Sequence, residues 1–152
     1  MYRRSEPCLR RGATLAEMGL VLSISVGLTL AVVVFGLGVY RYQQVAALAR
    51  EGARWASVHG GQWANGGTLT TQTDVKNVIT PMAVGLESSQ FTSTNPAVSW
   101  DDSAQKQTTS AGATNYVTVT VTYSWVPEVS IGPVFSIGPQ TLSSTARMPM
   151  QY

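Results

Sequence analysis

Glu17 and the residues just before it have the types and the spacing that could carry chemistry in this chain. A peptide bond cut between Gly12 and Ala13 would make Glu17 the fifth residue of the shortened chain and would create an amine at Ala13. On a helix the amine and the carboxylate would lie roughly 6 Å apart along the axis. We therefore expect them to pair, within one chain or between neighbouring chains. The alternative is that Glu17 only extends to the lipid headgroups at a membrane surface.

The other residues capable of catalysis or metal binding do not form a recognisable constellation. His59 is the only histidine, which excludes a His-rich metal site, and its place before Gly60 predicts a solvated helix end. Asp101-Asp102-Ser103 offers oxygen ligands of the kind that calcium prefers, but two adjacent acids without a loop consensus are more typical of a solvated turn. No phosphate loop, nucleophile elbow or His-Glu zinc motif is present. We predict no catalytic residue, no metal and no cofactor, and a protein that is not an enzyme.

The formal charge of +2 is concentrated at the N-terminus. Residues 1–12 contain four arginines and one glutamate, and the rest of the chain has six basic and seven acidic residues. This leader has the character of a membrane topology signal, so we expect no nucleic-acid partner. Cys8, the only cysteine, lies inside the leader, and a chain cut after it would have no thiol and no disulfide.

A charge-free apolar run extends from Met18 to Val39. It reaches the roughly 20 residues that a membrane-spanning helix needs, and it exceeds the apolar core of about 7–15 residues in a secretory signal. The arginines before it should stay in the cytoplasm, so that the C-terminal part lies outside. Tyr40 and Tyr42 fit the aromatic belt at the outer interface. We predict one transmembrane helix over 13–40.

Small residues recur at every fourth position of this run: Gly19, Ser23, Gly27 and Ala31. They form one stripe along a helix, a pattern that lets membrane helices approach closely. A helix-packing role is one interpretation of the stripe. The other is the general frequency of glycine in membrane helices.

The helical pattern continues beyond the membrane over 41–60. An apolar stripe at three- and four-residue spacing is formed by Val45, Leu48, Ala49, Gly52 and Ala56. One helix from Ala13 to Val58 would be about 65–70 Å long, and Gly60 and Gly61 follow in the usual stop position.

Residues 61–152 predict a small α+β domain. Turn chemistry at Trp63–Gly67 precedes a second helix capped by Thr73 or Asp74, with an apolar face made of Val75, Val78, Ile79 and Met82, an awkward Pro81 and a stop at Gly85. Strands are predicted at 97–100, at 116–123 with strict Val/Thr alternation, and at 141–150, separated by a polar loop at 101–115 and a Pro/Gly-rich segment at 127–139. About three antiparallel strands should pack their valine face on the outer half of the long helix. The tryptophans should pack there too, although an adhesive surface is the alternative.

Together these residues resemble the TadE-like minor pilins, or pseudopilins, of the tight-adherence (Tad, or Flp) pilus system. A glycine before a cut and a glutamate five residues after it mark the processing site of type IV pilin-like proteins, as in Arg10-Arg11-Gly12 with Glu17. The most specific match is Ala49-Arg50-Glu51-Gly52-Ala53-Arg54, and the Val-Thr strand and Leu142–Met148 add to it. Met18 follows Glu17 where the major Flp pilins have tyrosine, which favours a minor pilin.

The resemblance implies a 1–12 leader removed by a prepilin peptidase and a subunit that takes part in assembling or priming a Tad pilus. The implied partners are the peptidase, other minor pilins, the major Flp pilin, the inner-membrane Tad assembly platform and the lipid bilayer. The implied location is the bacterial inner membrane, with a single pass, or the pilus itself. Two alternatives remain: an uncleaved membrane-anchored binding module, and a pseudopilin of a general secretion system.

Overall fold

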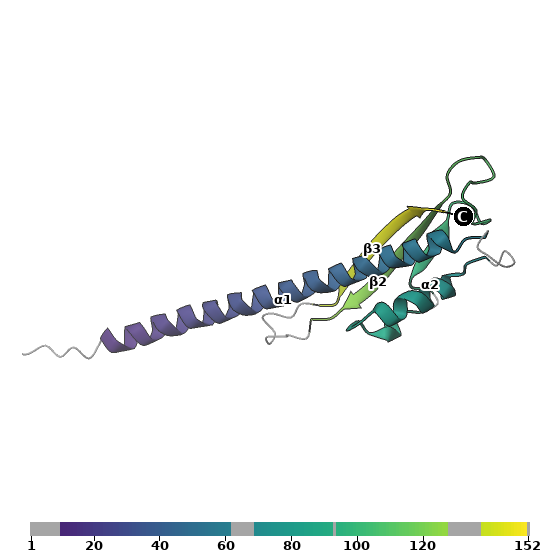
Figure 1. The fold of residues 1–152 in the computed structure, drawn as a ribbon. Coiled ribbons are helices and arrows are strands. Elements are labelled where there is room, and N and C mark those ends of the chain that lie inside the picture. The colour runs from purple at the N-terminus through teal and green to yellow at the C-terminus, as the bar shows by residue number, and fades with distance from the viewer. Residues whose placement is uncertain (1–9, 62–68, 93, 128–137, 152) are drawn as a thin grey trace, which may run out of the picture. The chain divides into compact units, whose positions relative to one another are not determined.

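The computed structural model of this chain describes residues 10–61, 69–92, 94–127 and 138–151. It divides into two compact units, residues 1–37 and 38–152. The helices are α1 (Arg10–Val58) and α2 (Gln72–Ile79), with two short 3₁₀ turns, η1 (Thr80–Met82) and η2 (Ser88–Gln90). The strands are β1 (Ala97–Trp100), β2 (Tyr116–Trp125) and β3 (Gln140–Pro149), shown in Figure 1. The predicted α+β class is confirmed. The expected turn at 63–67, most of the segment at 127–139 and residues 1–9 of the leader lie outside the described residues.

Helix α1 is a single helix because no proline and no turn sequence interrupts it from Arg10 to Val58. Its end is fixed by the residues that follow. The Gly61 amide donates to the Gln105 carbonyl (2.9 Å), and a Cβ at Gly61 would lie 2.4 Å from the Ala104 carbonyl oxygen. Only glycine allows this approach, so the glycine stop predicted from the sequence is confirmed and has a tertiary cause.

The three strands form an antiparallel sheet in the order β1-β2-β3. In β2 the valines Val117, Val119 and Val121 are fully buried, and the threonines between them lie on the other face. Thr120 faces Thr145 of β3 across that second face, with 2.9 Å between their hydroxyl oxygens. The alternation of β2 therefore sets one apolar and one polar face for the sheet.

The core of the second unit lies between the C-terminal turns of α1, the valine face of β2 and helix α2. From α1 it takes Val45, Leu48, Ala49, Ala53 and Ala56, all at most 4% exposed. Val75 and Ile79 of α2 complete it. Figure 1 shows these turns of α1 crossing the strands β2 and β3, with α2 on one side of the helix. The predicted packing of the helix stripe against the valine face is confirmed.

Helix α2 differs from the prediction at both ends. Thr71 is the cap, not Thr73 or Asp74: its hydroxyl accepts from the Asp74 amide, and the Asp74 carboxylate accepts from the Thr71 amide (2.9 Å). Asp74 is thus the third helical residue of a capping box. The α-helix ends at Ile79 and the chain continues into η1, because Pro81 has no amide to donate to the Asn77 carbonyl.

The predicted apolar face of α2 is therefore shorter than four residues. Val75 and Ile79 are buried and Val78 is half-buried, but Met82 falls in η1 and is exposed. Gly85, the expected stop, instead takes a positive φ of 77° in the loop after η1.

Candidate membrane anchor and assembly surface

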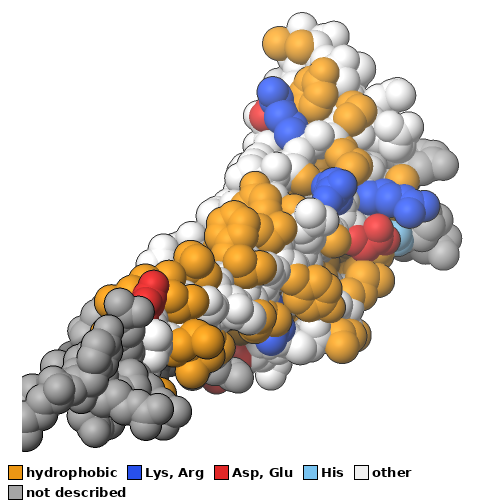
Figure 2. Space-filling model, turned by 90° about the vertical axis from the view of Figure 1, so that its left-hand side faces the viewer, with side chains coloured by type: hydrophobic (Ala, Val, Ile, Leu, Met, Phe, Trp, Pro, Cys, Tyr) orange, Lys and Arg blue, Asp and Glu red, His pale blue; other side chains and the backbone are white. Residues whose placement is uncertain are grey.

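The first unit, as far as it is described, is the part of helix α1 before Gly38, and most of its apolar side chains are exposed, although Val34 is buried. Leu15, Met18, Leu22, Val32 and Phe35 are each at least 65% exposed. Figure 2 shows this surface beside the grey N-terminal residues, with hydrophobic side chains in orange. A helix that is apolar all round is stable only in lipid or inside an assembly. Over the described residues, α1 is the one helix long and apolar enough to cross a membrane.

Gly12, Ala13 and Glu17 lie on exposed turns at the start of α1. Ala13 and Glu17 are four residues apart, so they share one face of the helix. Nothing lies within 4 Å of the position that a Cβ would take at Gly12. The Gly12–Ala13 bond belongs to the first turn, where backbone amides have no partner within the helix. The arrangement leaves this bond and the carboxylate accessible to an enzyme or to a neighbouring chain.

The small-residue stripe also faces outward. Gly19, Ser23 and Ala31 are exposed and Gly27 is half-buried, and a Cβ at either glycine would meet nothing within 4 Å. The Ser23 hydroxyl donates to the Gly19 carbonyl (2.8 Å), so it is satisfied within its own helix. The stripe is therefore a flat strip of backbone to which another helix could come close.

In the second unit, the segment Ala49–Arg54 has one buried and one exposed side. Ala49 and Ala53 are fully buried, and a Cβ at Gly52 would lie 3.2 Å from Val75, 3.3 Å from Ile79 and 3.3 Å from Val119. Three elements meet at Gly52, which explains why small residues recur there.

The charged residues of the same segment point away from the core. Arg54 and Glu51 form a long ion pair at 3.9 Å, with side chains 75% and 41% exposed. An exposed pair of this kind contributes little to stability. Arg50 donates from Nε to the Ala46 carbonyl of its own helix (3.1 Å). This face of α1 is free of the core and is available to other molecules.

His59 is not the solvated helix end that the sequence predicted. It is half-buried, and its ring stacks on Trp55 with 4.1 Å between the centroids. Thr70 donates its hydroxyl to the His59 carbonyl. The histidine thus joins the helix end to the segment before α2. His59 is half-buried instead of solvated because Trp55, one helical turn earlier, lies on the same face of the helix and covers its ring.

The acidic pair forms a turn, as expected. Asp102 accepts from the amides of Ala104 (2.9 Å) and Ser110 (2.8 Å), and these bonds hold the pKa of its carboxyl below the usual range. Asp101 pairs with Arg147 on β3 at 2.7 Å. In the described part of the chain no three His, Cys, Asp or Glu residues gather where they could hold a metal ion.

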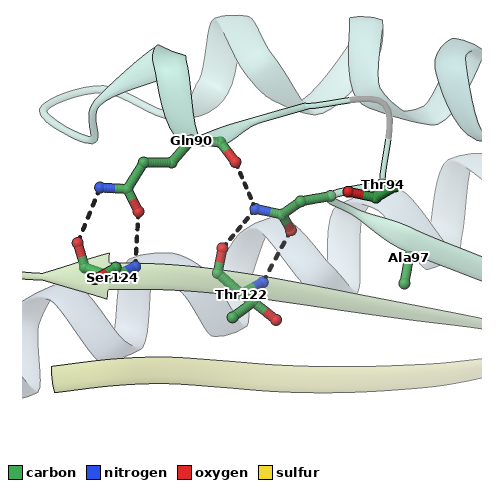
Figure 3. Close-up of a pocket in the computed structure, with 6 residues that line it drawn as sticks. Gln90, Thr94, Ala97, Thr122 and Ser124 are labelled. Atoms are coloured by element: carbon green, nitrogen blue, oxygen red, sulfur yellow. Dashed lines mark hydrogen bonds between the residues drawn. The ribbon is translucent and has the colours of Figure 1, made fainter.

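A polar hollow of about 500 Å³ lies beside β2, where β1 no longer pairs with it. Gln90 and Asn95 line it, and Figure 3 shows Gln90 beside Ser124 and Thr122. The Gln90 amide donates to the Ser124 carbonyl (2.9 Å) and accepts from the Ser124 amide (2.7 Å), and Asn95 does the same with Thr122 at 2.6 and 3.0 Å. The two side chains thus form the hydrogen bonds to the β2 backbone that a neighbouring strand would form. Their amide groups are therefore already satisfied. No motif in the sequence pointed to this pair.

Comparison with known families identifies part of the chain. The model of the family described as TadE-like protein matches residues 12–54. The N-terminal segment is TadE-like. The match runs from the predicted processing site to the end of Ala49–Arg54, so the resemblance inferred from the sequence is confirmed over this TadE-like segment. Neither a curated protein nor a solved structure matches the chain. The family points to a Tad pilus-associated protein, and TadE-like proteins are non-enzymatic in general.

Proposed function

We propose that this protein is a minor pilin, or pseudopilin, that takes part in assembling or priming a Tad pilus. One observation carries the proposal. The TadE-like segment 12–54 coincides with a single helix that is exposed and apolar at its start and forms the core of a folded unit at its end. The exposed apolar part of the helix could anchor the chain in the membrane or in the centre of a filament. The folded unit would then lie outside.

In this proposal the leader is removed on the cytoplasmic side by a prepilin peptidase, which cuts between Gly12 and Ala13. The mature chain crosses the bacterial inner membrane once, with residues 41–152 outside. It then associates with other minor pilins, with the major Flp pilin and with the inner-membrane assembly platform. Exposure of the Gly12–Ala13 turn supports the cut, because a peptidase must reach the bond.

Glu17 is the residue proposed to guide assembly. A carboxylate within a membrane helix costs a few kcal/mol near the bilayer centre and less near the interface. A partner amine lowers that cost, and the new amine at Ala13, on the same chain or a neighbour, is the partner that processing creates. The small stripe of Gly19, Ser23, Gly27 and Ala31 would let the helices of neighbouring subunits come close enough for that pairing.

Co-purification with the major pilin tests the role of Glu17. We expect Glu17→Gln to insert at the wild-type level but to recover less major pilin and to reduce piliation. Glu87→Gln is the matched control, since Glu87 is an exposed carboxylate outside α1 and outside the TadE-like segment. Undiminished association of Glu17→Gln would show that the charge is merely tolerated.

The same experiment separates the alternatives. An uncleaved binding module would keep its leader and would not recover pilin subunits. A pseudopilin of a general secretion system would recover the subunits of that system instead of the Flp pilin.

A further inference from the structure

One end of the second unit is held against the turns of α1 that directly follow the charge-free run. The Gln44 side chain donates from Nε2 to the Val84 carbonyl (3.0 Å) and to the Tyr40 hydroxyl (3.1 Å). Arg41 donates from Nη1 to the Gly85 carbonyl. The loop after η1 is therefore fixed beside residues 40–44 of α1.

The end of β2 is fixed at the same level of α1. A Cβ at Gly38 would lie 2.9 Å from Cζ3 of Trp125, so the indole ring rests on the helix backbone at that glycine. Val126 is the next residue. Two segments distant in sequence, the loop after η1 and the end of β2, thus come together around residues 38–44.

The side chains that these two segments expose are apolar. Val84 is 75% exposed, Val126 60% and Met82 51%, and Tyr40 and Tyr42 of α1 are 58% and 48% exposed. Single exposed apolar residues are ordinary on a protein surface. Here they gather at one end of the unit, and tyrosines are enriched where a chain leaves a membrane.

The charges at this end suit a lipid surface. Arg41 is a cation of the kind that lipid phosphates attract. Glu87, which follows the loop, is exposed, and its carboxylate can remain in water while its backbone amide donates to the Tyr123 hydroxyl (3.3 Å). The polar loop of 101–115 lies far away, because its Gln105 contacts Gly61 and Gly61 is about 30 Å farther along α1 than Tyr40.

We propose that Met82, Val84 and Val126 rest in the headgroup and upper acyl region of the outer leaflet, so that the second unit is seated on the membrane that α1 crosses. The occupant of this surface is lipid, because two of its exposed residues, Tyr40 and Tyr42, directly follow the charge-free run in sequence and flank the cation Arg41. The inference rests on the proposed membrane span. It adds a second contact with the bilayer, which would fix how far the unit stands from the membrane before assembly.

Fluorescence in vesicles tests this seating. The full chain with Cys8→Ser receives a single cysteine at Val84, at Val126 or, as the control, at Ala111, which is exposed in the distant polar loop. Each variant is labelled with an NBD dye and reconstituted in phosphatidylethanolamine–phosphatidylglycerol vesicles. We expect blue-shifted emission at Val84 and Val126, and quenching by lipids with a shallow doxyl group that exceeds the quenching at Ala111 severalfold.

Three other outcomes would each contradict the proposal in a distinct way. Emission at Val84 and Val126 equal to that at Ala111 would show that this end stands in water. Blue-shifted emission that doxyl lipids do not quench would show that another protein copy covers it. Failure of the protein to float with the vesicles would overturn the membrane span itself, and the proposed function would fall with it.

Discussion

Replacing Gly52 by alanine tests whether close packing at the crossing of α1, α2 and β2 holds the second unit together. The new methyl would lie 3.2 Å from a Val75 methyl and 3.3 Å from methyls of Ile79 and Val119. All three neighbours are fully buried, so none can move freely. Overpacking of a core typically costs about 1–3 kcal/mol, and alanine regains about 0.5–1 kcal/mol of helix preference over glycine.

The expected net effect of Gly52→Ala is a loss of up to about 2.5 kcal/mol, and each kcal/mol lost lowers the Tm by about 4–6 °C for a unit of this size. The assay is thermal unfolding of the full chain in detergent, followed by tryptophan fluorescence. All four tryptophans lie after residue 38, so the signal reports on the second unit.

A double-mutant cycle identifies the cause. Val75→Ala removes the closest methyl, so the combined variant should be less destabilised than the sum of the two single changes, by about 0.5 kcal/mol or more. A Gly52→Ala variant that melts higher than the wild type and shows no coupling with Val75→Ala would refute the packing explanation.

The other predictions concern the core, the α2 cap and the edge of β2. Val119→Asp should unfold the second unit, because it places an unpaired charge where the side chain is fully buried; loss of protease resistance checks this, and aspartate at a threonine of the opposite face is the control. The bonds donated by the Thr71 hydroxyl and amide hold the pKa of Asp74 below its ordinary value, so its contribution is present at neutral pH and is lost as the pH falls through roughly 4 and below; in Asp74→Asn this part of the pH dependence of the free energy of unfolding should disappear. Gln90→Ala with Asn95→Ala should cost about 0.5–1.5 kcal/mol for each hydrogen bond lost and should promote self-association through the opened edge, measured by urea unfolding and size-exclusion chromatography.

The long helix, the strands and their packing could be predicted because each follows from a local period. The stripe of Val45, Leu48 and Ala49 and the alternating valines of β2 are each apolar on one side, and two such surfaces must cover one another. The TadE-like segment was recognisable for a similar reason, since its residues are close in sequence. The same reasoning could not separate a helix-packing role of the Gly19 stripe from ordinary membrane composition.

The cap of α2 and the edge of β2 depend on choices that local patterns do not settle. Thr71, Thr73 and Asp74 are all good caps, and the choice was decided by the capping box that Thr71 makes with Asp74. Gln90 and Asn95 bind β2 more than 25 residues away in sequence. The half-buried state of His59 likewise follows from its stacking on Trp55 and from its contact with Thr70, which no sequence period describes.

The mass of the protein isolated from membranes tests the central claim most directly. In a strain with an active prepilin peptidase, we predict a mature N-terminus at Ala13. In a strain without the peptidase, or in the Gly12→Leu variant, we predict an inserted precursor whose N-terminus is Met1 or Tyr2. A chain that keeps residues 1–12 in the presence of the active peptidase would contradict the account and would favour the uncleaved binding module.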